Sequence, residues 1–127
     1  MKKILVVEDD PSMRWLLRNL LRNEYEVITK NNGIEAFSWL SVQNIPDLII
    51  SDIKMPLMDG LEFIENLSIS GLYKNIPVIV LTGHGDSATF KRCTNLGVYS
   101  YMTKPFKPTE LLEKIAFPFV SQMFLEN

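Results

Sequence analysis

The sequence has 127 residues, a length typical of one domain with a single core, and 46% of its residues are hydrophobic. Lys and Arg number 13 and Asp and Glu number 15, so the net charge of −2 argues against a nucleic-acid-binding surface. With Cys93 as its single cysteine the chain cannot form an internal disulfide, which fits a reducing compartment. No apolar run reaches the roughly 20 residues that span a bilayer. We therefore expect a cytoplasmic, one-domain protein that binds neither membranes nor nucleic acids directly.

The first half of the chain alternates between strand and helix patterns. Residues 4–7 form a continuous apolar run, which is typical of a strand covered on both faces. Pro11 then begins a helix, in which apolar residues recur at helical spacing as far as residue 21. Residues 25–29 alternate as an edge strand does, and Gly33 precedes a second helix.

The second half repeats this pattern three times. Strands are predicted at 47–52, 78–81 and 98–102, and the first two of them are strongly apolar. A helix is predicted after each strand. The first has Phe63, Ile64 and Leu67 on its inward side, and the second begins after a cap at Asp86 or Ser87 and ends at Gly97. The third begins at Pro108. Alternating strands and helices with short connections predict an α/β fold, a doubly wound parallel sheet of five strands with helices on both faces.

Polar residues stand where the predicted strands end. Ligands of doubly wound sheets bind beyond these carboxyl ends, where the winding reverses. The residues found there are Glu8, Asp9 and Asp10 after the first strand, Asp52 after the third, Thr82 after the fourth and Lys104 after the fifth. Singly, each has an ordinary explanation: Asp10 is predicted to cap a helix, Asp52 could serve in a turn, and Lys104 is a typical surface charge. Their combination points to a site.

Three carboxylates at one edge of a sheet repel one another unless a cation neutralises them. Only oxygen ligands are available, with no Cys or His at zinc spacing, so a hard divalent ion such as Mg²⁺ is expected. A metal ion, a lysine and a hydroxyl together suit a phosphoryl group, and a carboxylate can act as its nucleophile. The chain has no GxxxxGK[ST] loop, so ATP is not expected to be the direct phosphoryl donor.

Four segments carry a resemblance to a known family. VVEDDP, LIISDIKMPLMDG, VIVLTGHG and YMTKPF resemble the four signatures of bacterial response-regulator receiver domains, in order, between about residues 2 and 115. The resemblance implies a flavodoxin-like (βα)₅ fold with strand order 2-1-3-4-5. It also implies phosphoryl transfer from a histidine kinase or a histidine phosphotransfer protein, in two-component signalling.

The resemblance implies roles for the residues at the predicted metal site. Asp52 resembles the phospho-accepting aspartate, which is also a metal ligand. Asp9 and Glu8 resemble the acidic pair at the metal, Asp9 as a direct ligand and Glu8 through water. The backbone carbonyl of Lys54 completes the protein ligands of Mg²⁺, for which Mn²⁺ is expected to substitute.

The resemblance also implies a switch. Thr82 resembles the switch hydroxyl, Lys104 the phosphate-pairing lysine and Tyr101 the aromatic residue that moves inward, and Lys104–Pro105 is expected to be a cis peptide. Phosphorylation then alters the surface of the fourth helix, fifth strand and fifth helix, which signals to a partner or an output domain.

The lifetime of the phosphoryl group is expected to depend on three neighbouring residues. Gly83 is small and leaves the group open to its donor and to water. Lys54 and His84 occupy the positions that flank the phosphate in this family, and we expect both to tune the rate of dephosphorylation. The alternative for His84, which stays open, is an exposed loop residue without such a role.

Two other functions fit parts of the sequence less well. A Mg²⁺-dependent phosphohydrolase with an aspartate nucleophile usually carries a general acid two residues later, where this chain has Lys54. A flavodoxin-like flavin binder needs Ser, Thr and Gly donors after the first strand, where this chain has EDDPSM. We therefore expect a signalling switch with weak autophosphatase chemistry rather than an enzyme.

The end of the chain is unusually apolar. We assign residues 1–116 to the receiver domain and 117–127 to a tail that begins near Pro118, where a proline inside a helix kinks or ends it. Two interpretations stay open: a kinked helix that folds onto its own domain, or a surface for a partner, a homodimer or the start of a linker. A homodimer could also use the fourth helix, fifth strand and fifth helix. The effector is not encoded in this sequence.

Overall fold

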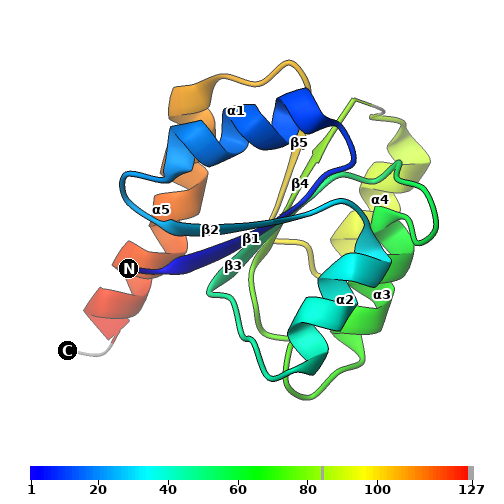
Figure 1. The fold of residues 1–127 in the computed structure, drawn as a ribbon, viewed down its shortest axis with the longest axis horizontal. Helices are drawn as coiled ribbons and strands as arrows, with labels where there is room; N and C mark the ends of the chain where they lie inside the picture. Colours follow the sequence, from blue (N-terminus) through cyan, green and yellow to red (C-terminus); the bar gives the residue numbers. More distant parts are fainter. Residues whose placement is uncertain (84, 126–127) are drawn as a thin grey trace.

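The computed structural model describes residues 1–83 and 85–125, with side chains described as far as residue 121. Within these residues the strands are β1 (Lys3–Val7), β2 (Glu26–Lys30), β3 (Leu48–Ser51), β4 (Val78–Thr82) and β5 (Ser100–Thr103). The helices are α1 (Pro11–Leu21), α2 (Gly33–Ser41), α3 (Gly60–Ser68), α4 (Ser87–Asn95) and α5 (Pro108–Leu125). The strands pair in parallel in the order β2-β1-β3-β4-β5 (Figure 1), which confirms the predicted fold, although β5 begins two residues later than expected.

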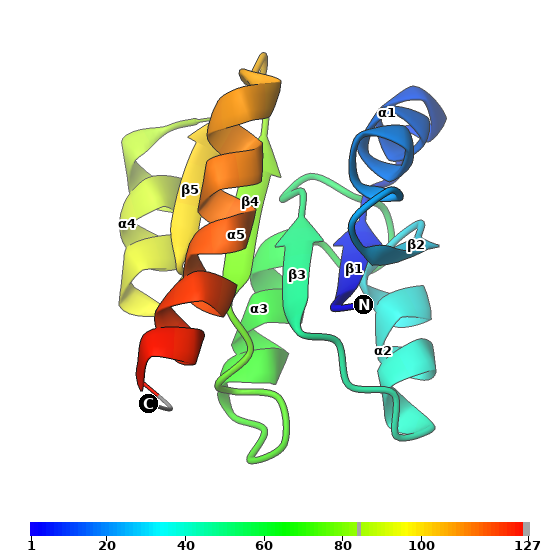
Figure 2. The same cartoon turned by 90° about the vertical axis from the view of Figure 1, so that its left-hand side faces the viewer.

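The helices cover both faces of this sheet. Helices α1 and α5 lie on one face and α2, α3 and α4 on the other, as the two views in Figures 1 and 2 show. Alternate side chains of β1 point to opposite faces, so Ile4 and Val6 join the core under α1 and α5. Leu5 and Val7 join the core under α2, α3 and α4. Because both faces are buried, polar side chains of the central strands can reach solvent only near the strand ends.

Side-chain caps begin the helices that follow the first four strands. Asp10 caps α1 by accepting a hydrogen bond from the backbone N–H of Ser12 at 3.2 Å, as its position before a proline predicts. Asn32, Asp59 and Asp86 cap α2, α3 and α4 by accepting from the backbone N–H three residues later. Each cap satisfies an N–H group that the start of a helix leaves unpaired. The caps therefore hold one end of each connection at the carboxyl edge of the sheet.

Helix α5 continues through Pro118 instead of ending there. Proline has no N–H to donate to the carbonyl four residues earlier, which is that of Lys114. The hydroxyl of Tyr99 donates to this carbonyl oxygen at 2.9 Å. A side chain from just before β5 thus replaces the hydrogen bond that the proline removes.

The residues around Pro118 divide between the domain and solvent. The ring of Phe119 packs against the ring of Tyr25, with centroids 5.9 Å apart, and the Lys2 ammonium lies 5.5 Å from the Phe119 centroid. Phe117 and Val120 are exposed, at 61% and 48%. This part of the tail therefore packs on its own domain and also presents apolar side chains outward. Among the described residues, no helix is both long and apolar enough to cross a membrane.

Candidate functional site

The site begins at the ends of the two central strands, β1 and β3. These strands are adjacent and in register, with Val7 opposite Ser51, and the backbone N–H of Asp52 donates to the Val7 carbonyl at 3.0 Å. Glu8, Asp9 and Asp52 therefore emerge side by side. One carboxylate oxygen from each lies within 4.8 Å of the others. Glu8 and Asp52 are buried, at 2% and 9% exposed, whereas Asp9 is exposed.

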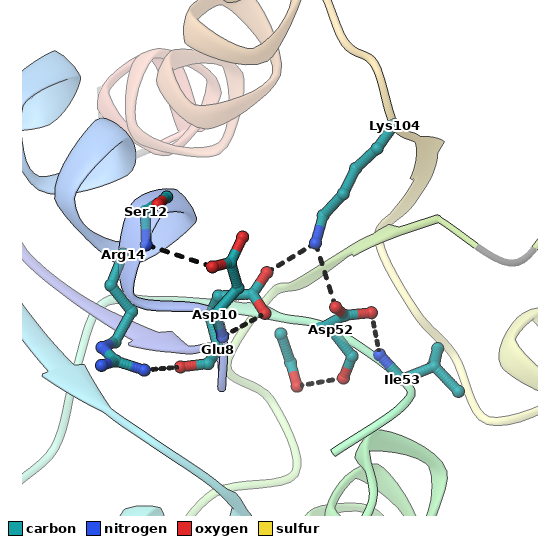
Figure 3. A network of polar contacts seen from close by, with 8 residues as sticks. Glu8, Asp10, Ser12, Arg14, Asp52, Ile53 and Lys104 are labelled. Atoms are coloured by element: carbon teal, nitrogen blue, oxygen red, sulfur yellow. Dashed lines mark hydrogen bonds and ion pairs between the residues drawn. The ribbon is translucent and has the colours of Figure 1, made fainter.

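Lys104 reaches into this acidic cluster from the end of β5 (Figure 3). Its Nζ lies 2.6 Å from Glu8 Oε1 and 3.0 Å from Asp52 Oδ2. The backbone N–H of Lys104 donates to the Thr82 carbonyl at 2.8 Å, and the Lys104–Pro105 peptide bond is cis. Burial lowers the pKa of the Lys104 ammonium, but its hydrogen bonds to Glu8 and Asp52 outweigh burial and raise that pKa above its ordinary value. Lys104 is therefore a fixed positive charge between the two carboxylates.

One lysine does not neutralise the whole cluster. Burial, with a contribution from the charge of Asp52, raises the pKa of Glu8 from 4.5 to about 7, despite hydrogen bonds from Lys104 and from the Asp10 N–H. The ionised form of Glu8 is thus disfavoured at this position. Additional positive charge would relieve the cluster, and three neighbouring carboxylates are suitable oxygen donors for a hard divalent cation. The residues present fit a Mg²⁺ ion.

Asp52 itself is held at several points. Its Oδ1 accepts from the backbone N–H of Ile53 at 2.6 Å (Figure 3). The Ser51 hydroxyl donates to the backbone carbonyl of Asp52 at 2.8 Å. Gly60 packs against the same backbone, where an added Cβ would lie 2.0 Å from the Asp52 carbonyl oxygen. The loop from β3 to α3 can therefore close onto Asp52 only because residue 60 has no side chain.

The other predicted residues lie around this cluster. Lys54 is exposed in the loop after β3, two residues from Asp52. Thr82, the last residue of β4, is fully buried. Tyr101 of β5 is half-buried, and its ring meets that of Phe90 in α4 edge-on, with centroids 5.2 Å apart. Gly83 follows Thr82, and the predicted rate-tuning residue His84 lies outside the described residues.

Sequence reasoning missed two residues that support the site. The guanidinium of Arg14 donates from Nη1 to the Glu8 carbonyl at 2.8 Å and so fixes the end of β1 (Figure 3). No sequence signal indicates this, because Arg14 lies on the polar side of a helix. Gly60 has no role in the sequence-based prediction, because residue type alone does not show that the Asp52 carbonyl lies against it.

Comparison with known proteins identifies the relatives of the chain. A sequence model described as the response regulator receiver domain matches residues 4–116. The chain is 36% identical over 115 residues to the chemotaxis protein CheY1 of Helicobacter pylori strain J99, which covers 89% of this chain and 93% of CheY1.

Solved structures show the same likeness. The phosphorylated cyanobacterial phytochrome response regulator RcpA superposes with a TM-score of 0.80 at 30% identity, over 88% of this chain and 86% of RcpA. The receiver domain of the sensor histidine kinase PA1611 from Pseudomonas aeruginosa PAO1 has a magnesium ion coordinated in its active-site cleft. It superposes with a TM-score of 0.81 at 28% identity, over 91% of this chain and 94% of that domain.

Proposed function

The chain belongs to the response regulator receiver family, and from this premise we propose that Asp52 accepts a phosphoryl group from a histidine kinase or a histidine phosphotransfer protein. Receiver domains are signalling switches rather than classical enzymes, and accepting a phosphoryl group is their general function. The finer assignment to Asp52 with Mg²⁺ rests on the arrangement of this chain's own residues, whereas the proposed cytoplasmic location rests on its single cysteine, Cys93.

The observation that carries the proposal is the fixed position of the Asp52 carboxylate among charged partners. One oxygen accepts from the Ile53 N–H and the other faces Lys104 Nζ, while Glu8 and Asp9 lie beside it. The carboxylate attacks the phosphorus of a phosphohistidine in line. A P–O bond to Asp52 forms as the P–N bond breaks, and the electron pair leaves with the imidazole.

The acidic cluster supplies the candidate ligands for a divalent cation. Glu8, Asp9, Asp52 and the backbone carbonyl of Lys54 would hold Mg²⁺, which offsets the negative charge of the phosphoryl oxygens when it is bound; Mn²⁺ is expected to substitute. Lys104 Nζ, which now lies 3.0 Å from Asp52 Oδ2, is placed to pair with a phosphoryl oxygen on that carboxylate.

Thr82 and Tyr101 are the proposed link from the phosphoryl group to the surface. The Thr82 hydroxyl at the end of β4 moves toward the phosphoryl group, and the Tyr101 ring follows inward and changes its contact with Phe90 of α4. The surface formed by α4, β5 and α5 then signals to a partner or an output domain. Moving such an equilibrium from about 1:99 to 99:1 requires about 5.5 kcal/mol of preference for the active state.

Two features of the proposal concern lifetime and assembly. Lys54, Gly83 and His84 tune the rate of dephosphorylation, and the exposure of Lys54 two residues from Asp52 supports its part in this. Exposed Phe117 and Val120 support a contact surface on α5, which a partner or a second copy of the chain could use.

Phosphorylation by a small-molecule donor tests the central proposal. We expect the protein to gain one phosphoryl group, measured by intact mass, on incubation with acetyl phosphate and Mg²⁺, and to gain it much more slowly in EDTA. Asp52→Asn should gain none. Asp47→Asn is the matched control, because Asp47 lies just before β3, at the opposite end of this strand. An adduct on Asp52→Asn, or none on the wild-type protein, would overturn the assignment. A phosphohydrolase would instead release phosphate from phosphate monoesters without a stable adduct.

A further inference from the structure

The connection between β4 and α4 is anchored at both ends. Thr82 closes β4 inside the sheet, and the Asp86 side chain caps α4 by accepting from the backbone N–H and the hydroxyl of Thr89, at 2.7 and 3.0 Å. Between the two anchors, the surroundings of the two glycines differ sharply. A Cβ on Gly83 would meet no atom within 4 Å, whereas a Cβ on Gly85 would lie 2.7 Å from the Thr103 methyl carbon.

The Gly85 contact lies among the residues of the proposed switch. Thr103 is the register partner of Thr82 across β4 and β5, and it directly precedes Lys104. The position of a Gly85 Cβ is also 3.7 Å from the Tyr101 hydroxyl oxygen. Gly85 therefore lies close to both Thr103 and Tyr101, two β5 side chains between the phosphoryl site at Asp52 and the surface of α4.

A larger residue at position 85 would meet the side chain of Thr103, which is exposed. Thr103 is β-branched, so its side chain has few low-energy rotamers, and its backbone is paired with that of Thr82. Cβ contacts at 2.7 Å essentially never occur, so either the Thr103 side chain would have to leave its present rotamer or residue 85 would have to shift outward from β5.

We propose that Gly85 is a positioning residue for the switch: because it has no side chain, Gly85 lies against Thr103 and holds the resting arrangement of Thr82 and Tyr101. This inference rests on the proposed function of Asp52. A methyl group at position 85 penalises the resting arrangement and shifts the population toward one in which residue 85 has moved away from Thr103. The phosphoryl group favours that second arrangement, so its binding is strengthened by the same factor.

The test compares Gly85→Ala with a variant that removes the colliding methyl group. Thr103→Ser lacks that methyl carbon but keeps the hydroxyl, so Gly85→Ala/Thr103→Ser should behave as the wild-type protein does. Beryllium fluoride with Mg²⁺, a mimic of an acyl phosphate on a carboxylate, is titrated by fluorine NMR. We expect Gly85→Ala to bind it about tenfold more tightly, a factor that corresponds to about 1.4 kcal/mol, and Thr103→Ser alone to bind as the wild type does.

A second readout does not depend on phosphorylation. Cross-relaxation between the rings of Tyr101 and Phe90, measured by NMR in the free protein, should weaken in Gly85→Ala and recover in the double variant. Gly83→Ala should leave this ring contact intact, since a methyl group there meets open space.

Unchanged or weaker beryllium fluoride binding by Gly85→Ala refutes the inference, and so does failure of Thr103→Ser to restore the ring contact. If the wild-type protein does not bind beryllium fluoride at all, the proposed function fails, while the ring contact still decides whether Gly85 positions Tyr101. Chemical denaturation of each variant shows whether it is folded, and an unfolded Gly85→Ala that Thr103→Ser does not rescue also counts against the inference.

Discussion

Replacing Glu8 by glutamine should stabilise the metal-free protein at alkaline pH. Glu8 is buried beside Asp52, and its pKa rises to about 7 because burial disfavours its charged form. Glutamine has nearly the same shape and, like protonated Glu8, keeps one acceptor oxygen, which can accept from Lys104; the Asp10 N–H, which donates to the other Glu8 oxygen at 3.2 Å, loses its acceptor. The substitution therefore removes the cost of a buried charge and reproduces the hydrogen-bonding groups of the protonated acid.

The expected size and pH dependence follow from proton linkage. The pKa of Glu8 is about 7 in the folded chain and near 4.5 when unfolded, so the folded state binds more protons between these values. The free energy of unfolding of the wild type should thus fall as pH rises from about 4.5 to about 7 and then level off. One pKa unit corresponds to about 1.4 kcal/mol, so Glu8→Gln should be more stable by up to about 3 kcal/mol at pH 8. Below about pH 4.5 the two proteins should be equal.

Urea unfolding in EDTA, between pH 4 and pH 8.5, measures this difference, with the exposed Glu24→Gln as the control for a surface carboxylate. Adding Mg²⁺ should then stabilise the wild type more than Glu8→Gln, because a ligand that binds only the folded state adds to its stability. The reasoning is refuted if Glu8→Gln is no more stable than the wild type at pH 8, or if its advantage does not depend on pH.

Three further predictions concern α5, the loop after Asp52, and α1. Tyr99→Phe should lower the free energy of unfolding by about 1 kcal/mol in the wild type. In a Pro118→Ala background it should change hardly at all, because the new N–H of residue 118 can pair with the Lys114 carbonyl. Equal losses in both backgrounds would show that the Tyr99 hydroxyl does not replace the hydrogen bond that Pro118 removes. Gly60→Ala should destabilise the protein by at least about 2 kcal/mol in urea unfolding and slow phosphorylation by acetyl phosphate, because a Cβ there collides with the Asp52 carbonyl. If Gly60→Ala keeps wild-type stability, the close approach of that loop is wrong. Trp15, which is 67% exposed on α1, is a candidate contact for the phosphoryl donor protein. Trp15→Ala should slow phosphoryl transfer from a histidine phosphotransfer protein at least about fivefold but leave phosphorylation by acetyl phosphate unchanged. This pair of results would separate partner contact from chemistry.

The sheet and the place of the site could be predicted because both depend on local patterns. Apolar runs such as residues 4–7 and 78–81 indicate buried strands, and strands that alternate with helices leave few topologies to consider. Once the sheet is parallel, its strands all end at one edge, so Glu8, Asp9 and Asp52 could be expected there from their positions alone. The four family signatures added roles that spacing alone does not assign.

Contacts between distant segments could not be predicted in the same way. The position of Lys104 Nζ, 2.6 Å from Glu8 and 3.0 Å from Asp52, depends on how the end of β5 lies against β4. The support of Glu8 by Arg14 depends on the angle at which α1 packs. The tight fit of Gly85 against Thr103 depends on the course of a loop that composition leaves open.

Pro118 shows most clearly the difference between what the sequence determines and what only tertiary contacts determine. The sequence by itself determined the parallel sheet, the acidic strand ends and the presence of a helix-breaking residue in α5, because each follows from residue type and spacing along the chain. Whether the helix ends at Pro118 was decided only in the tertiary structure, where Tyr99 donates to the Lys114 carbonyl and Phe119 packs on Tyr25. A local penalty of about 3 kcal/mol can be offset by contacts with groups far away in the chain, and those contacts exist only after the chain has folded.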